Sequence, residues 1–241
     1  MLNAAKYFLI VCTTFLFFAC KKSKNNNTVP SPLSSTPSYS FSGVCSTQLY
    51  QLITGVSTTT SNGQQIAYFS SNNFDNFFLN PPSLNVGTVK LNGVAFRNYM
   101  NFYSDSTGAI FSSPLTWEIS GGAINSFTFT NTNPYPAISG YTLWPDTISI
   151  SSGFNISLAG SSNIDQLELI LSDNDTTTVF NYAQSALSNY SYSPTKLTGI
   201  ATNTTATLQI DLFNNNIQTI AGKQINFRNT TSYSKTFWVK N

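Results

Sequence analysis

Side chains that could carry out chemistry are scarce in this sequence. Its 241 residues include nine Asp and Glu and no histidine. Without an imidazole, the chain can build neither a Ser-His-Asp nor a Cys-His catalytic arrangement, nor any metal site that needs a histidine ligand. We therefore expect no cofactor. The enzyme classes that stay open are those that use carboxylates.

Glu118 and Glu168 are the two glutamates and the first candidates for such chemistry. A glycoside hydrolase needs two carboxyl groups flanking the bond that it cleaves. Each glutamate, however, occupies a polar position in a segment of alternating polar and apolar residues, where solvation is a sufficient explanation. A carboxylate-based glycan hydrolase is therefore kept as an alternative to a non-catalytic function, and no catalytic residue is assigned.

Asp173 and Asp175 flank Asn174 and could offer oxygen ligands to calcium. The glycine and the distal glutamate of an EF-hand loop are absent, and Asp and Asn favour a hairpin turn by themselves. We therefore predict a turn and no metal site, with Asp173 and Asp175 as the candidate ligands if a loop elsewhere completes one.

Aromatic side chains are plentiful, with 19 Phe, 12 Tyr and 3 Trp. Most should pack in a core, because β-sheet proteins bury large rings. Rings near loops or a domain boundary could instead stack on a sugar. The candidate ligand-binding residues on this argument are Tyr99, Tyr103, Tyr135 and Trp144.

The N-terminus has the organisation of a secretory signal. Lys6 precedes an apolar run, residues 7–19, which ends at Cys20. The run has the length of a signal-peptide core and is too short to span a bilayer as a helix. Ordinary cleavage before Cys20 would leave Phe17 at the −3 position, where a small residue is preferred. Three interpretations are compatible with this segment: lipidation of the chain at Cys20, secretion without a lipid, and a short membrane helix.

Ala19-Cys20 resembles the end of a bacterial lipobox, and the loose box followed by Lys and Asn resembles uncharacterised lipoproteins of Bacteroidota. The resemblance implies a signal peptide at 1–19 and lipidation of Cys20, which anchors the chain to the membrane through its acyl chains. No Asp follows the cysteine, so the resemblance implies the outer membrane of the cell envelope. Whether the body faces the periplasm or the cell surface stays open.

Charge argues against a nucleic-acid partner. Four of the eleven Lys and Arg precede Asn25, so the remainder carries seven basic against nine acidic residues, a net charge of −2. A nucleic-acid-binding body would need a basic stripe.

Cys45 is the one cysteine that remains after removal of the expected signal peptide and lipidation of Cys20. An intrachain disulfide is therefore excluded.

Patterning after the linker at residues 20–38 predicts an all-β body. Asn92-Gly93 predicts a two-residue hairpin within 88–97, with Leu91 opposite Val94, and Asn62-Gly63 predicts a second hairpin. Strands are also expected around 115–119 and 127–129. The break near residue 140, which is rich in proline, predicts an N-terminal β domain at 39–140 and a second domain at 141–241.

The second half shows about seven short strands, which is typical of an immunoglobulin-like antiparallel β-sandwich. They are expected at 147–151, 153–158, 164–171, 177–183, 204–213, 223–228 and 233–239, with a short turn at 194–197. Together these features predict a non-catalytic envelope lipoprotein that binds an unknown protein or glycan. A structural assembly component, joined to others through a strand edge, is a further alternative.

Overall fold

The computed structural model describes residues 41–74, 84–99, 102–105, 107–173, 178–184 and 188–241. Cys20, the expected signal peptide and linker, and Asp175 lie outside these residues. The described chain is nearly all β, with predominantly antiparallel sheets in a sandwich-like arrangement, as the sequence predicted. Within it, no helix is long and apolar enough to cross a membrane.

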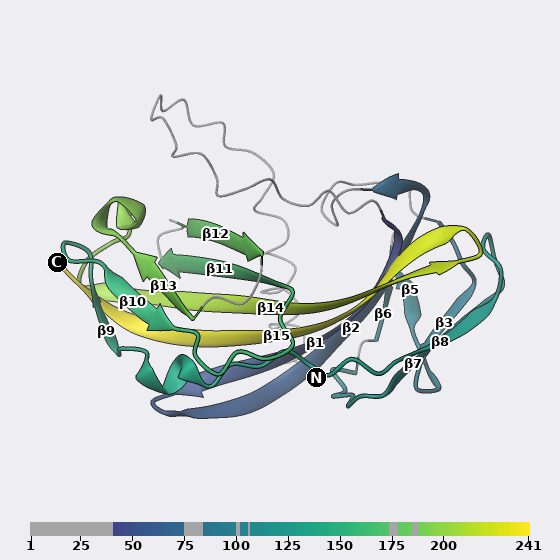
Figure 1. Cartoon of the computed structure of the whole chain (residues 1–241), viewed down its shortest axis with the longest axis horizontal. Helices are drawn as coiled ribbons and strands as arrows, with labels where there is room; N and C mark the ends of the chain where they lie inside the picture. Colours follow the sequence, from purple (N-terminus) through teal and green to yellow (C-terminus); the bar gives the residue numbers. More distant parts are fainter. Residues whose placement is uncertain (1–40, 75–83, 100–101, 106, 174–177, 185–187) are drawn as a thin grey trace. The chain divides into compact units, whose positions relative to one another are not determined.

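One large sheet organises the fold (Figure 1). Its strands follow the order β12, β11, β14, β15, β1, β2, β6 and β5, and β9 pairs with the end of β15. Their bounds, in the same order, are Thr178–Gln184, Gln166–Asp173, Thr204–Ile220, Lys223–Lys240, Phe41–Thr54, Ser57–Phe74, Phe102–Ser104 and Arg97–Tyr99, with β9 at Thr147–Ser149.

Two smaller sheets and two 3₁₀ turns complete the described elements. One sheet has the order β4, β3, β7 and β8 (Val94–Ala95, Thr88–Leu91, Leu115–Ser120 and Phe127–Asn131). The other pairs β10 with β13 (Phe154–Ser157 and Asn189–Tyr192), and the turns are η1 (Gly140–Leu143) and η2 (Pro194–Leu197). Figure 1 shows β3, β7 and β8 near one end of the long β14–β15 hairpin, and β9, β10 and β13 near the other.

Strand β15 contributes to two apolar clusters on one face of the large sheet, here called the front face. Successive side chains of a strand alternate between faces, and the odd-numbered residues of β15 point to the front. Ile225 and Phe227 join the Trp117 cluster, which is formed with β1, β2, β3, β6 and β7. Tyr233, Phe237 and Val239 join the Trp144 cluster, which is formed mainly with β11, β14 and the β10–β13 sheet.

An asparagine belt separates the two clusters on the front face. Asn229 of β15 is 1% exposed and accepts hydrogen bonds from Thr47 Oγ1 (3.0 Å) and Asn131 Nδ2 (3.2 Å). Its own amide donates to the Asn133 carbonyl oxygen at 2.6 Å. Two further side chains of β14 complete the set, which consists of Thr47, Asn131, Asn133, Asn214, Asn216 and Asn229. The belt fixes the segment after β8 to the large sheet.

A buried lysine fixes the segment after η1. Lys235 Nζ donates to the Trp144 carbonyl oxygen at 2.8 Å and pairs with Asp146 Oδ1 at 2.9 Å. Its side chain is 4% exposed, so the ion pair and the carbonyl together compensate the charge where β15 passes the Trp144 cluster.

The Asn92-Gly93 hairpin is confirmed, with Leu91 paired to Val94 and positive φ angles of 48° and 81° at the two turn residues. The Asn62-Gly63 hairpin is wrong. Both residues lie inside β2, and the turn falls at Gly55 and Val56 instead. A Cβ at position 63 would overlap the Ala109 carbonyl oxygen, so this glycine permits a close approach rather than a turn.

Several strands of the second half are confirmed, but β13 (Asn189–Tyr192) was not predicted, and two further differences concern the last strands. The segments expected at 223–228 and 233–239 are one continuous strand, β15, and the segment expected at 204–213 extends to Ile220 in β14. Polar residues such as Asn229 and Thr230 broke the apolar alternation and suggested a gap. In the structure they are buried members of the same strand.

Asn229→Ala tests the belt. The substitution removes three buried hydrogen bonds, and we expect it to lower the free energy of unfolding by roughly 1–3 kcal/mol. Urea denaturation of the purified protein measures this. Asn125→Ala, at an exposed loop position, serves as the control and should have little effect. Equal stability of the two variants would contradict a structural role for the belt.

Candidate functional site

The face of the large sheet opposite the two clusters, here called the back face, is rich in hydrogen-bonding side chains. One row runs across four strands in register: Glu168 of β11 is paired with Asp211, Asp211 with Ser232, and Ser232 with Tyr50. Flanking positions on the same face add amides. We call this set the polar ladder: Gln48, Tyr50, Gln64, Glu168, Gln209, Asp211 and Ser232.

Hydrogen bonds connect the ladder from β14 to β2. Gln209 Nε2 donates to both carboxylate oxygens of Asp211, at 3.0 and 2.9 Å, and the Ser232 hydroxyl also donates to Asp211. Gln48 Nε2 donates to Ser232 Oγ at 2.6 Å. At the far end, the Tyr50 hydroxyl donates to Gln64 Oε1 at 2.8 Å. Each ladder side chain except Glu168 is therefore held by a hydrogen bond to a neighbour on an adjacent strand or on its own strand.

Both carboxyl groups of the ladder, those of Glu168 and Asp211, have a raised pKa. The pKa of the Glu168 carboxyl is raised to about 7, first by burial and then by the nearby Asp211, against the lowering effect of Arg228. Burial also raises the pKa of Asp211, while the hydrogen bonds from Ser232 and Gln209 lower it. The two carboxyl groups are cross-strand neighbours, so each disfavours the ionisation of the other.

Beside the ladder, the next rows carry a cation and unsatisfied polar atoms. The Arg228 guanidinium lies over the Phe213 ring, 4.7 Å from its centroid. Thr230 is 2% exposed, and its hydroxyl has no hydrogen-bond partner in the described part of the chain. The same holds for the side-chain carbonyl oxygen of Asn226, at the far end of this face. Buried polar atoms normally find partners, so this face has hydrogen-bonding capacity to spare.

An aromatic pair lies at the β5–β6 end of the same face. Ala67 and Tyr103 point into the Trp117 cluster, so the alternating residues Phe102 and Ser104 point to the back. Tyr99 is paired with Phe102, and their rings lie 5.8 Å apart with an interplanar angle of 30°. Phe102 is 38% exposed and is thus a ring that a ligand can reach.

The structure separates the four aromatic candidates from the sequence. Tyr99 lies on the back face, as described above. Tyr103 is buried in the Trp117 cluster, where its hydroxyl donates to Asn85 Oδ1 at 3.0 Å. Tyr135 is half-buried against that cluster, and Trp144 is 4% exposed, with Nε1 donating to the Ser157 carbonyl oxygen at 2.6 Å. Tyr103 and Trp144 therefore act in packing.

The two glutamates are not brought together as a catalytic pair. Glu118 is paired in register with Lys90 on the side of the small sheet that points away from the Trp117 cluster, whereas Glu168 lies on the back face of the large sheet. Asp173 is 9% exposed and accepts a hydrogen bond from the Ala201 amide at 2.8 Å. No group of three or more acidic or Cys side chains that could hold a metal occurs among the described residues.

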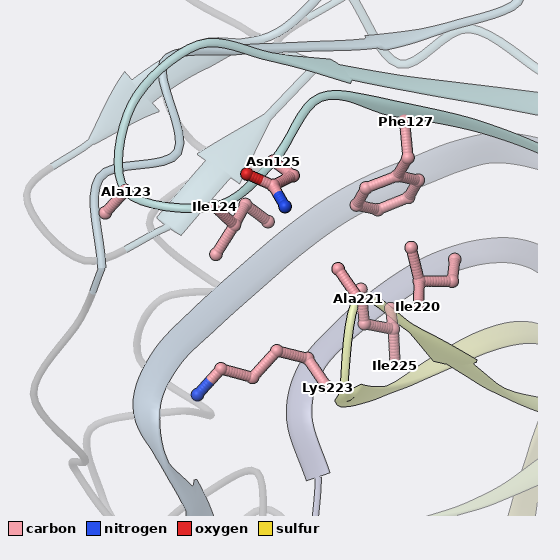
Figure 2. Close-up of a pocket in the computed structure, with 8 residues that line it drawn as sticks. All are labelled: Ala123, Ile124, Asn125, Phe127, Ile220, Ala221, Lys223 and Ile225. Carbon is pink, nitrogen blue, oxygen red and sulfur yellow. The ribbon is translucent and has the colours of Figure 1, made fainter.

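Figure 2 shows a small pocket of about 160 Å³ between the β7–β8 loop and the turn of the β14–β15 hairpin. Its lining is mostly apolar, including Ile124, Phe127 and Ile225, with Lys223 at one side. Typical small-molecule sites have about 300–1,000 Å³. This pocket is therefore a weaker candidate than the polar ladder.

Sequence analysis missed Asp211, Gln209 and Arg228. Asp211 lies within a strand of alternating pattern, and the pattern itself placed it opposite the core residues Ile210 and Leu212. Its partner Glu168 was identified, but only strand pairing shows that the two are neighbours. The signal in the sequence was one acidic residue in each of two predicted strands, Glu168 and Asp211. These strands are neighbours in the structure.

Comparison with models of known protein families finds no match, and comparison with curated protein sequences finds none either.

Glu168→Gln tests the environment of the ladder. The pKa of Glu168 is higher in the folded protein than the ordinary value of 4.5, so between about pH 4.5 and 7 the folded state binds more protons than the unfolded chain. Stability should therefore fall as pH rises through this window, by on the order of 2 kcal/mol. We expect the variant to flatten this slope in urea titrations at several pH values. If the pH dependence of stability is the same in the variant and the parent protein, the raised pKa of Glu168 is contradicted.

Proposed function

We propose that the protein is an envelope lipoprotein, anchored in the outer membrane through a lipid on Cys20, that binds a glycan on the back face of its large sheet. The anchor is supported by the apolar run before Ala19-Cys20 and by the basic residues that follow. The binding role is supported by the polar ladder together with the absence of histidine.

The observation that carries the binding role is the set of hydrogen-bonding side chains on the back face. They come from five neighbouring strands, and all but Glu168 are held by hydrogen bonds to one another, which reduces the entropy lost when a ligand binds. The Thr230 hydroxyl adds unused hydrogen-bonding capacity. A ligand with many hydroxyl groups matches this mixture of donors and acceptors better than an apolar one.

The Tyr99–Phe102 pair supports a glycan rather than a small polar metabolite. The pair and the ladder share one face of one sheet: β6, which carries Phe102, is next to β2 with Gln64, and Glu168 lies further along the sheet on β11. An extended oligosaccharide can stack the apolar face of one sugar on Phe102 while its other units reach the amides and carboxyl groups of the ladder.

Phe102→Ala tests this role. We expect the purified protein to bind at least one polysaccharide in a panel of bacterial and plant glycans. Loss of the exposed ring should weaken that binding about 3- to 10-fold, because aromatic contacts contribute roughly 0.5–1.5 kcal/mol. Affinity electrophoresis and calorimetry measure this. Val56→Ala, at an exposed apolar position in the β1–β2 turn, is the matched control. The absence of binding across the panel would overturn the proposal.

Cys20→Ala tests the anchor. In cells that produce the full chain, the parent protein should fractionate with membranes and incorporate labelled fatty acid, because acyl chains contribute about 0.8 kcal/mol per buried methylene. The variant should lose the label and the membrane association. Cys45→Ala, which changes a buried core thiol, should keep both. A membrane-associated, unlabelled parent protein would contradict lipidation.

A glycan hydrolase is the second candidate, and the neighbouring Glu168 and Asp211 favour it. Cross-strand neighbours have Cβ atoms about 4.5–5.5 Å apart, and a carboxyl group with a pKa of about 7 is suited to act as a general acid. Analysing the same glycan incubations for shortened products decides between the two. Products that disappear with Glu168→Gln while binding persists would establish the enzyme.

A further inference from the structure

The back face holds an excess of negative charge at one place. Glu168 and Asp211 are cross-strand neighbours, and Arg228 is the cation that acts on both carboxyl groups. With both carboxyls ionised, the three groups carry a net charge of −1. Repulsion between two neighbouring carboxylates in a partly buried site is costly, and a second cation would relieve it.

The unused hydrogen-bonding positions of Glu168 and Asp211 are acceptors and not donors. Asp211 accepts three hydrogen bonds, from Gln209 and Ser232. A carboxylate has about four acceptor positions, so Asp211 has room for one more donor. Glu168 receives no hydrogen bond from any described residue, although it is half-buried. The unused groups of the pair are therefore acceptors.

Thr230 provides an independent indication of a ligand at this site. It lies on the same face as Ser232, two residues along β15, and is paired with Phe213, which is two residues from Asp211. Its hydroxyl is buried and unpartnered within the described residues. Thr230 is one strand over and two residues along from Asp211, with strands about 4.8 Å apart and a rise of about 3.3 Å per residue, so a neighbouring sugar unit of a ligand seated on the carboxyl pair can extend toward this hydroxyl.

We propose that the glycan carries a free primary amine, and that its ammonium group binds between Glu168 and Asp211. The three N–H donors of an ammonium group fit the unused acceptor positions of the two carboxylates. A hydroxyl of the same or the neighbouring sugar then satisfies Thr230. This inference rests on the proposed glycan-binding function and narrows it to amino sugars that are not acetylated.

The test compares two oligosaccharides that differ only at nitrogen. Oligomers of β-1,4-linked glucosamine and their N-acetylated counterparts are titrated into the purified protein at pH 7 by calorimetry. We expect the free amine to bind about tenfold or more tightly, because hydrogen bonds to charged groups exceed neutral ones by about that factor. Glu168→Gln should remove this preference. Glu118→Gln, on the small sheet, is the matched control and should keep it.

The outcomes separate this inference from the function on which it rests. Equal binding of both oligomers, or a preference that survives Glu168→Gln, overturns the ammonium site, while binding itself still supports a glycan-binding role. If neither oligomer binds but another polysaccharide of the panel does, the inference fails and the function stands. If no glycan binds, both fail. Thermal unfolding of Glu168→Gln verifies that a lost preference does not come from a misfolded variant.

Discussion

The parallel pairing of β1 with β15 is the constraint on which the rest of the structure depends. Ten consecutive residues of β1, from Gly43 to Leu52, align with Ile225 to Ser234. This pairing joins the β1–β2 hairpin to the β14–β15 hairpin and makes one sheet of the two halves of the chain. Without it, the Trp117 cluster loses the connection between β1 and β15, and the row that begins at Glu168 ends at Ser232.

The same sheet separates two tasks by face. On the front, Ile225, Phe227 and Phe237 hold the smaller sheets, and the asparagine belt fills the interval between two apolar clusters with satisfied hydrogen bonds. On the back, the alternate residues of the same strand are polar, and within the described residues Asn226 and Thr230 each have a buried atom without a hydrogen-bond partner, as Thr231 does on the front. A strand whose polar residues are buried on both faces is expensive to build. The hydrogen bonds that are formed offset part of this cost.

Local patterns predicted much of the fold and little of the site. The class, the Asn92-Gly93 turn and most strand positions follow from alternation and turn chemistry, which act over a few residues. The prediction from Asn62-Gly63 was wrong because Gly63 is required for the close approach of Ala109. The sequence does not distinguish such a glycine from one that is required by a turn. The site depends on which strands are neighbours. Glu168 was visible as an acidic residue, but its pairing with Asp211 and the remoteness of Glu118 are properties of topology that no local pattern encodes.

The pairing of β1 with β15 also sets the order in which the chain can fold. Thr47 and Asn229, which meet in the belt, are separated by 182 residues. Closing the loop between such partners costs chain entropy before their contact contributes any stabilising free energy. Contacts between residues distant in sequence therefore slow folding. The first strand of the body therefore waits, with one edge unpaired, until the last strand emerges. For a chain made or exported from its N-terminus, the interval is the entire length of the body, and during it the edge of β1 is open to pairing with other chains.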